Sequence, residues 1–306
     1  MRIAIISDIH GNISALSNVL EDAEKQGVTD YIFVGDYIFD LPFANEVVDT
    51  IRKIENAHFV QGNKEVYLCE LAEQDQSTWN IDQIGVLHQT FRELSRENRE
   101  YLMAMPETCR VSMPYSGEIL VTHFVKEIAA ADIKGSLLSS GVFNEKKPTR
   151  EEFLSGKDEF LQRDKIKEAI QKLHADVVIQ GHTHLQWHGY CSDTLMLNAG
   201  SCGLPLDGGV GGAYTILEDT PQGLKVEERR VWYDIEPIIE KAKKSLCYEK
   251  GKIWMELVFM AMRDNQDGFG IFFELAQRLA EEAGESGNHY SNETWNRAGE
   301  MFFGEE

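Results

Sequence analysis

Seven side chains with lone pairs that bind metal ions follow short apolar runs of this sequence. They are Asp8, His10, Asp36, Asn63, His123, His182 and His184. Together they offer two carboxylates, four imidazoles and one amide oxygen, with no thiolate among them. Such ligands suit Mn, Fe, Zn or Co. Because seven ligands exceed the needs of one ion, the pattern favours a centre with more than one metal.

The elements that would position these side chains are short β-strands. Apolar runs that end just before the seven residues predict strands over residues 2–7, 31–34, 57–60, 118–121 and 176–179. Later runs predict strands over residues 194–197, 213–216 and 226–232. The earlier runs alternate with amphipathic helical patterns, as in βαβ units of a mostly parallel sheet. Open α/β sheets bind ligands at the carboxyl ends of their strands, so we expect one crevice to collect the seven side chains.

Helical patterns account for most of the remaining chain. Apolar side chains recur at helical spacing over residues 13–23, 42–54 and 78–105. Residues 127–163 carry turn signals and weak periodicity, which predicts a long connection with a short helix. After Trp232 the sequence pattern changes from strand-like to helical, and three helices are predicted over residues 234–246, 253–261 and 271–283.

Glycines accompany the polar residues at three of these strand ends, as Gly35-Asp36, Gly62-Asn63 and Gly181-His182. Glycine gives the backbone room for close approach and for unusual dihedral angles. A single histidine or Gly-Asp pair after a strand is an ordinary turn. Ligand-type residues at five consecutive strand ends are not expected by chance, so we interpret them as one site.

The order and spacing of these motifs resemble the signature of the calcineurin-like metallophosphoesterases. The motifs are Asp8-Ile9-His10-Gly11-Asn12, Gly35-Asp36, Gly62-Asn63, His123 and Gly181-His182-Thr183-His184. Residues 198–203 also resemble the Asn-Pro-Gly-Ser-x-Gly stretch of the small bacterial branch, which includes phosphodiesterases and diadenosine tetraphosphatase-like enzymes. The resemblance covers residues 1–232. It implies a four-layer α/β/β/α sandwich of two mixed sheets, with residues 233–306 as a C-terminal helical extension packed on or extending the same domain.

The resemblance also implies a role for each ligand-type residue. One metal would be held by Asp8, His10 and His184, and the other by Asn63, His123 and His182. Asp36 would bridge the two ions. Two metals about 3.5 to 4 Å apart activate a water molecule and clamp the attacking and leaving oxygens of a phosphoryl group. The resemblance favours Mn as the divalent ion, with Fe, Zn, Co or Ni as alternatives.

Position 64 departs from the family, which usually has histidine after the Gly-Asn pair. The residue here is Lys64, which we group with Asp36 and Asn63 as catalytic. One interpretation makes it a surface lysine paired with Glu65, and the other makes it a point charge on the phosphoryl group. An unperturbed lysine titrates near ~10.4 and is a poor general acid. We therefore expect substrates with good leaving groups, such as a nucleotide phosphate or an aryl oxide.

A second departure follows the 198–203 motif, where the family branch often has arginine. This chain reads Gly203-Leu204-Pro205-Leu206-Asp207 instead. Arg110, Lys126 and Lys134 are candidates to replace that cation, although solvated surface charge is the favoured interpretation for all three.

Composition limits the partners and the compartment. Apolar residues make up 42% and charged residues 26% of 306, which is typical of a folded globular chain. The net charge of -21 argues against long nucleic acids and anionic membranes. The odd number of cysteines, five, includes no Cys-x-x-Cys pair, and no apolar run approaches ~18 residues. These features favour a reducing, cytoplasmic location.

The sequence thus predicts a dinuclear hydrolase that acts on a small phosphodiester or on a nucleotide phosphoanhydride such as diadenosine tetraphosphate. Two alternatives stay open: a serine/threonine protein phosphatase-like hydrolase, and a catalytically weakened metal-binding scaffold that recruits a protein partner. For the C-terminal helices, core packing is favoured over homo-oligomerisation or a lid.

Overall fold

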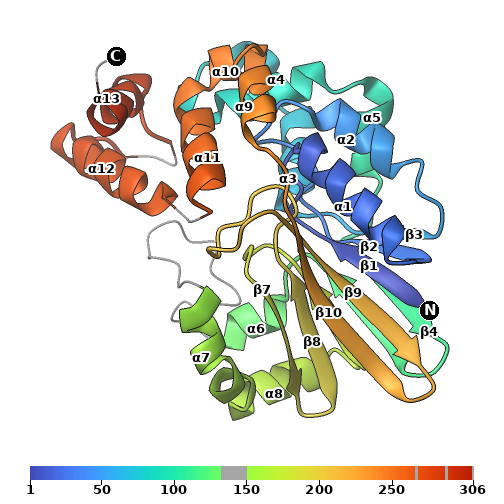
Figure 1. Cartoon of the computed structure of the whole chain (residues 1–306). Coiled ribbons are helices and arrows are strands. Elements are labelled where there is room, and N and C mark those ends of the chain that lie inside the picture. The colour runs from blue at the N-terminus through green and yellow to red at the C-terminus, as the bar shows by residue number, and fades with distance from the viewer. Residues whose placement is uncertain (132–149, 266–267, 287–288, 305–306) are drawn as a thin grey trace.

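Two mixed β-sheets form the centre of the computed structural model, which describes residues 1–131, 150–265, 268–286 and 289–304 (Figure 1). The first sheet contains β1 (Arg2–Ile6), β2 (Asp30–Phe33), β3 (Ala57–Phe59), β9 (Gly212–Thr220) and β10 (Gly223–Val231). The second contains β4 (Thr108–Met113), β5 (Gly117–Thr122), β6 (Val177–Gln180), β7 (Gln186–Cys191) and β8 (Thr194–Ala199).

Each sheet combines parallel with antiparallel strand pairs. The first sheet runs β10-β9-β1-β2-β3, with parallel β1–β2 and β2–β3 pairs. The second runs β4-β5-β6-β8-β7, with parallel β5–β6 and β6–β8 pairs. Because β1, β2 and β3 are parallel in the first sheet and β5, β6 and β8 in the second, the loops after their carboxyl ends gather at the same end of each sheet.

Successive side chains of β1 point to opposite faces of the sheet, which explains how the layers pack. Ile3 and Ile5 lie in the apolar cluster between the two sheets, which Val121 and Ile179 enter from the second sheet. Ala4 and Ile6 point to the opposite face and join the helices that cover the first sheet. A strand with both faces buried reads as a continuous apolar run, as residues 3–6 do.

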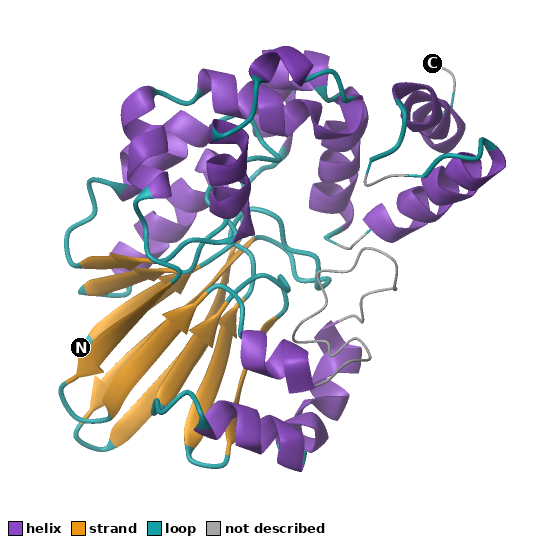
Figure 2. Cartoon of the chain, turned by 180° about the vertical axis from the view of Figure 1, so that it is seen from behind, coloured by secondary structure: helices purple, strands orange, loops and turns teal. Residues whose placement is uncertain are grey.

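Helices cover the outer faces of both sheets (Figure 2). The first sheet is covered by α1 (Ile13–Lys25), α2 (Ala44–Ile51), α3 (Asn63–Ala72), α4 (Gly85–Glu93) and α5 (Arg96–Met103), with short 3-10 turns at Gln76–Thr78 and Asp82–Ile84. The second sheet is covered by α6 (Lys126–Ala131), α7 (Arg150–Leu161) and α8 (Asp164–Gln171). The four-layer sandwich of two mixed sheets expected from the sequence is confirmed.

The C-terminal helices pack beside α4 and the loops above the sheets. They are α9 (Glu236–Ala242), α10 (Leu246–Lys250), α11 (Lys252–Asp264), α12 (Phe269–Glu282) and α13 (Asn292–Phe303). Their apolar side chains share one cluster with Val86 of α4 and with Leu41, Phe43, Leu204 and Leu206. The helices are therefore joined to the sandwich through a continuous apolar core.

The predicted strands agree with the structure within a few residues, but two strands were missed. Both β4 and β7 lie at the edges of the second sheet. Edge strands tolerate polar residues on the face toward solvent, and Arg110 and Ser112 of β4 are examples. Because polar and apolar residues are mixed in both strands, neither contains a continuous apolar run.

The helical predictions need four corrections. The predicted helix over 78–105 is broken into α4 and α5, and α3 was missed. The expected connection over 127–163 contains all of α7, and its residues 132–149 lie outside the described part. After Trp232 the described residues form five helices rather than three. Within the described ranges, no helix is both long and apolar enough to cross a bilayer.

Candidate metal centre

The seven side chains predicted from strand ends converge at one place, where the loops after the strands of both sheets meet. Asp8, His10 and Asp36 lie in loops of the first sheet, and His123 and His182 in loops of the second. The backbone N–H of His182 lies 3.2 Å from each carboxylate oxygen of Asp8, which links the two sheets across the site. Asn63 and His184 complete the group, as the distances below show.

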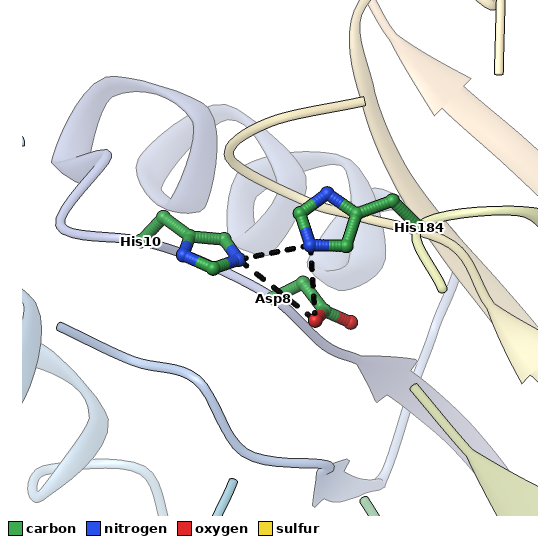
Figure 3. Close-up of side chains that lie close together, drawn as sticks. All are labelled: Asp8, His10 and His184. Atoms are coloured by element: carbon green, nitrogen blue, oxygen red, sulfur yellow. Dashed lines mark hydrogen bonds and ion pairs between the residues drawn. The ribbon is translucent and has the colours of Figure 1, made fainter. Parts of the chain in front are cut away.

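One group of ligand atoms comes from Asp8, His10 and His184 (Figure 3). The Nε2 atoms of His10 and His184 are 3.1 Å apart, and Asp8 Oδ1 lies 3.4 Å from the latter and 3.8 Å from the former. Ligands that share an ion at bond lengths of about 2.1 Å stand roughly 3.0 to 3.4 Å apart at octahedral to tetrahedral angles. The three buried side chains could therefore hold one metal ion with little movement.

A second group lies beside it. His123 Nε2 is 3.5 Å from Asp36 Oδ1 and 3.1 Å from Asn63 Oδ1, and His182 Nδ1 is 3.0 Å from the same Asn63 oxygen. The other Asp36 oxygen, Oδ2, lies 3.9 Å from His10 Nε2. The Asp36 carboxylate thus faces a ligand atom of each group. Asp8, Asp36 and His123 also form a set that could hold a metal ion.

The far ring nitrogens of three histidines have partners that orient the rings. Nδ1 lies 2.6 Å from Asp40 Oδ2 for His10, from the Val34 carbonyl for His123, and from the Leu204 carbonyl for His184. When Nδ1 donates to such an acceptor, Nε2 keeps a lone pair for the centre. Metal-binding histidines typically have this arrangement, so the donor set fits divalent metal ions.

The pKa shifts of the buried groups also support a site for divalent metal ions. Burial would raise the pKa of Asp8, but His184 and His10 lower it to about 2. Burial would lower the pKa of His10, but neighbouring carboxylates raise it to about 9. The same balance raises the pKa of His123 to about 10, chiefly through Asp36. The carboxylates thus stabilise positive charge at the facing ring nitrogens, and a divalent ion would supply such charge.

The backbone around the centre adopts dihedral angles that most residues avoid. Positive φ angles between 52° and 69° occur at Asp8, His10, Asp36, Asp40, His182 and His184. Each non-glycine residue held in this region costs of order 1–3 kcal/mol. Hydrogen bonds between the loops hold it there, since the N–H groups of Ile9 and His10 both donate to the Asp36 carbonyl. The fold thus holds strained residues where their side chains meet.

Two of the glycines at the strand ends are required because neighbouring atoms leave no room for a Cβ atom. A Cβ at Gly62 would lie 2.2 Å from Asp36 Oδ1, and one at Gly181 would lie 2.0 Å from Ser7 Oγ. Any larger residue would displace the side chains of the centre. The interpretation of these glycines as sources of backbone room is confirmed.

The interpretation of Lys64 as a surface residue is wrong. Its side chain is only 12% exposed, and its Nζ lies 3.3 Å from Asp40 Oδ2 rather than beside Glu65. Burial would lower the pKa of Lys64, but Asp40 and Asp36 raise it above its usual value. Glu65 instead accepts hydrogen bonds from the backbone N–H groups of Asp36, Tyr37 and Gly62. Lys64 therefore lies in the centre as a fixed positive charge.

Sequence reasoning missed Asp40, which connects three parts of the site. Its Oδ2 faces His10 and Lys64, and its Oδ1 accepts a hydrogen bond of 2.7 Å from Trp254 Nε1 of α11. The position of Asp40, four residues after Asp36 and beyond the same strand, was an available signal. No sequence pattern connects it with Trp254, which lies 214 residues away.

Two of the three candidate replacement cations, Arg110 and Lys126, do not reach the centre. Arg110 pairs with Glu118 and donates to backbone carbonyls of residues 173 and 174. Lys126 pairs with Glu107 at the surface, 3.0 Å away. Lys134 lies outside the described residues. The interpretation of Arg110 and Lys126 as surface charges is confirmed.

A cavity of about 530 Å³ opens from the centre toward the C-terminal helices. Its inner end is lined by the centre itself, including His10, Asp36, Asn63, Lys64 and His184. Its outer part is lined mainly by apolar and aromatic residues, namely Tyr67, Leu71, Ile84, Leu87, Leu206, Trp254, Phe269 and Phe273. A volume of this size is typical of pockets for small organic ligands.

Comparison with known proteins gives three kinds of similarity. Residues 1–220 match the family model of the calcineurin-like phosphoesterase superfamily domain. An uncharacterized protein of Methanocaldococcus jannaschii is 26% identical over 258 residues, which cover 79% of this chain and 92% of that protein.

Two solved structures share the fold. A metallophosphoesterase from Sphaerobacter thermophilus superposes with a TM-score of 0.62 at 19% identity and covers 87% of this chain and 99% of its own. A hypothetical protein from Pyrococcus horikoshii has a TM-score of 0.59 at 17% identity and covers 84% and 97%, respectively.

Proposed function

Since the chain belongs to the calcineurin-like phosphoesterase superfamily and is thus a phosphoric ester hydrolase, we propose that it hydrolyses a small phosphodiester or nucleotide phosphoanhydride with two divalent metal ions. The observation that carries the proposal is the convergence of seven ligand-type side chains from both sheets. Three of the four imidazoles in this group have their far nitrogen engaged, as metal-binding histidines do.

The residues divide between two ion sites. Asp8, His10 and His184 would hold one ion, Asn63, His123 and His182 would hold the other, and Asp36 would face both. Bound ions of this kind lower the pKa of a water molecule and polarise phosphoryl oxygens. Mn is the ion that we propose, with Fe, Zn, Co or Ni as alternatives.

Lys64 would stabilise negative charge that develops on the phosphoryl group. Its raised pKa keeps it protonated near neutral pH, so it holds its proton rather than giving it to the leaving group. Substrates whose leaving group needs little protonation would suffer least from this arrangement. An aryl oxide and a nucleotide phosphate are such groups.

The charge of the protein and the shape of the site support a small substrate. The net charge of -21 repels long polyanions. The cavity of about 530 Å³ has room for one small organic group beyond the phosphoryl site. A small phosphorylated molecule is therefore the proposed partner.

The test is Mn-dependent hydrolysis of bis-p-nitrophenyl phosphate and of diadenosine tetraphosphate by the wild type, Asp36→Asn and Lys64→His. Asp193→Asn, which changes an exposed aspartate in a turn, is the matched control. We expect activity in the wild type and in the control, and a loss of more than about 100-fold in Asp36→Asn.

Two results would overturn the proposal. Equal activity of Asp36→Asn and Asp193→Asn would remove Asp36 from the chemistry. An inactive wild type that gains activity in Lys64→His would identify the protein as a metal-binding scaffold.

A further inference from the structure

The outer wall of the cavity is built by a part of the chain beyond the family match. The match ends at residue 220, whereas Trp254 on α11 and Phe269 and Phe273 on α12 line the cavity. The C-terminal helices therefore do more than bury apolar surface, because they shape the space that the substrate must enter.

Trp254, Phe269 and Phe273 form an aromatic wall of the cavity, which is held in a defined position. Trp254 Nε1 donates to the buried Asp40 carboxylate at 2.7 Å, and the Lys64 ammonium lies 5.9 Å from the centre of the Trp254 ring. The ring centroids of Phe269 and Phe273 lie 5.4 Å and 6.4 Å from that of Trp254. Rings fixed in this way lose little conformational entropy when a ligand stacks on them.

The charge of the lining restricts what can fill the outer cavity. Among the described lining residues, Lys64 is the only lysine or arginine, and it lies at the inner end. The other polar side chains of the outer lining are those of Glu70, Gln74, Gln83 and His289, and the apolar ones include Ile84 and Leu87. A chain of further phosphates would find no lysine or arginine there, whereas an uncharged, flat apolar group would find matching surface.

We propose that the C-terminal helices form the binding wall for a planar aromatic group, a nucleobase or an aryl ring, that is esterified to the phosphoryl group at the centre. Trp254 is the specificity-determining residue of this wall. The inference rests on the proposed function and refines it, since it favours a diester with an aromatic group over a polyphosphate chain. Aromatic stacking of a base or ring on tryptophan is the physical basis of the preference.

Binding measurements test the wall independently of turnover. Calorimetry in the presence of Mn compares AMP with ribose 5-phosphate, which differ by the base, and phenyl phosphate with methyl phosphate, which differ by the ring. In the wild type we expect the aromatic member of at least one pair to bind about tenfold more tightly. The pair that shows the preference identifies the group as a nucleobase or an aryl ring.

Three variants locate the preference. Trp254→Ala should reduce it to about twofold or less, while Trp254→Phe, which keeps a ring but loses the bond to Asp40, should retain most of it. Leu87→Gln makes another part of the apolar lining polar and leaves Asp40 unchanged, and it should also weaken the preference. Trp232→Ala removes a tryptophan that is 71% exposed and serves as the matched control. Thermal melts establish that each variant is folded.

The outcomes separate this inference from the proposed function. Equal affinities within both pairs for the wild type would overturn the aromatic wall, even if bis-p-nitrophenyl phosphate is hydrolysed. A preference that survives in folded Trp254→Ala and Leu87→Gln would overturn it as well. A wild type that shows the preference but no metal-dependent turnover would overturn the proposed function and leave the wall supported.

Discussion

Replacing Asp40 with asparagine should weaken metal binding although Asp40 is not among the proposed ligands. The carboxylate is 2% exposed and contacts three groups, with Oδ2 at 2.6 Å from His10 Nδ1 and 3.3 Å from Lys64 Nζ, and Oδ1 at 2.7 Å from Trp254 Nε1. Two ring N–H donors thus share one carboxylate with the Lys64 ammonium, and an acceptor-only group satisfies all three.

An asparagine cannot satisfy both donors, because one end of its side chain is an NH₂ group. If the amide oxygen faces Trp254, the NH₂ group faces His10 Nδ1, which must then accept and move its proton to Nε2. The Nε2 lone pair would be lost to the centre. If the oxygen faces His10, the NH₂ group opposes the indole N–H and α11 loses its anchor.

The expected magnitude follows from the role of such partners. Loss of the group that orients a metal-binding histidine costs about 10- to 100-fold in metal affinity, or roughly 1.4 to 2.7 kcal/mol. The assay is calorimetric titration of metal-free protein with Mn. Asp193→Asn is the matched control, and Trp254→Phe, which loses only the bond to α11, should keep its affinity.

The result that would refute this reasoning is a folded Asp40→Asn protein that binds Mn within about twofold of the wild type. In that case the proton on His10 would not be set by Asp40. A loss of affinity in Trp254→Phe as large as in Asp40→Asn would also contradict it, because the α11 contact would then be the cause.

Two further predictions concern buried titratable side chains. Lys64→Gln should lower kcat/KM for bis-p-nitrophenyl phosphate by about 10- to 100-fold in steady-state kinetics, because it removes a charge-assisted contact to phosphate, and an unchanged value would argue against that contact. Burial and Arg92 lower the pKa of His88 to about 4, below about 6.5 in the unfolded chain, so the unfolded chain binds more protons between these values and stability falls as the pH falls. Urea unfolding should therefore show that His88→Gln spares about 2 kcal/mol of the stability that is lost between about pH 7 and pH 5, and His58→Gln, at an exposed position, is the control.

Local patterns made much of the centre predictable. Asp8, Asp36 and His182 follow apolar runs whose two faces are both buried, and such runs indicate strands without knowledge of their neighbours. Since parallel strands of one sheet present their carboxyl ends at one edge, the proximity of Asp8 and Asp36 followed from their positions in the chain, whereas His182 joins them from the second sheet. The family resemblance rested on the same short motifs.

Edge strands and distant contacts were not predictable in this way. The strand β4 exposes alternate residues to solvent and β7 contains the polar Gln186 and His188, so their sequences lack the continuous apolar signal. The burial of Lys64 depends on Asp40, and the aromatic wall depends on Trp254 and Phe273 from the far end of the chain.

The sequence by itself determined which side chains are available at the strand ends, because strand formation and turn geometry depend on neighbouring residues. Only the tertiary structure decided that Lys64 is a buried charge, that Asp40 links His10 with Trp254, and that the C-terminal helices line the cavity. These contacts join segments up to 214 residues apart. Their formation depends on the packing of the whole core, which no local pattern of residues encodes.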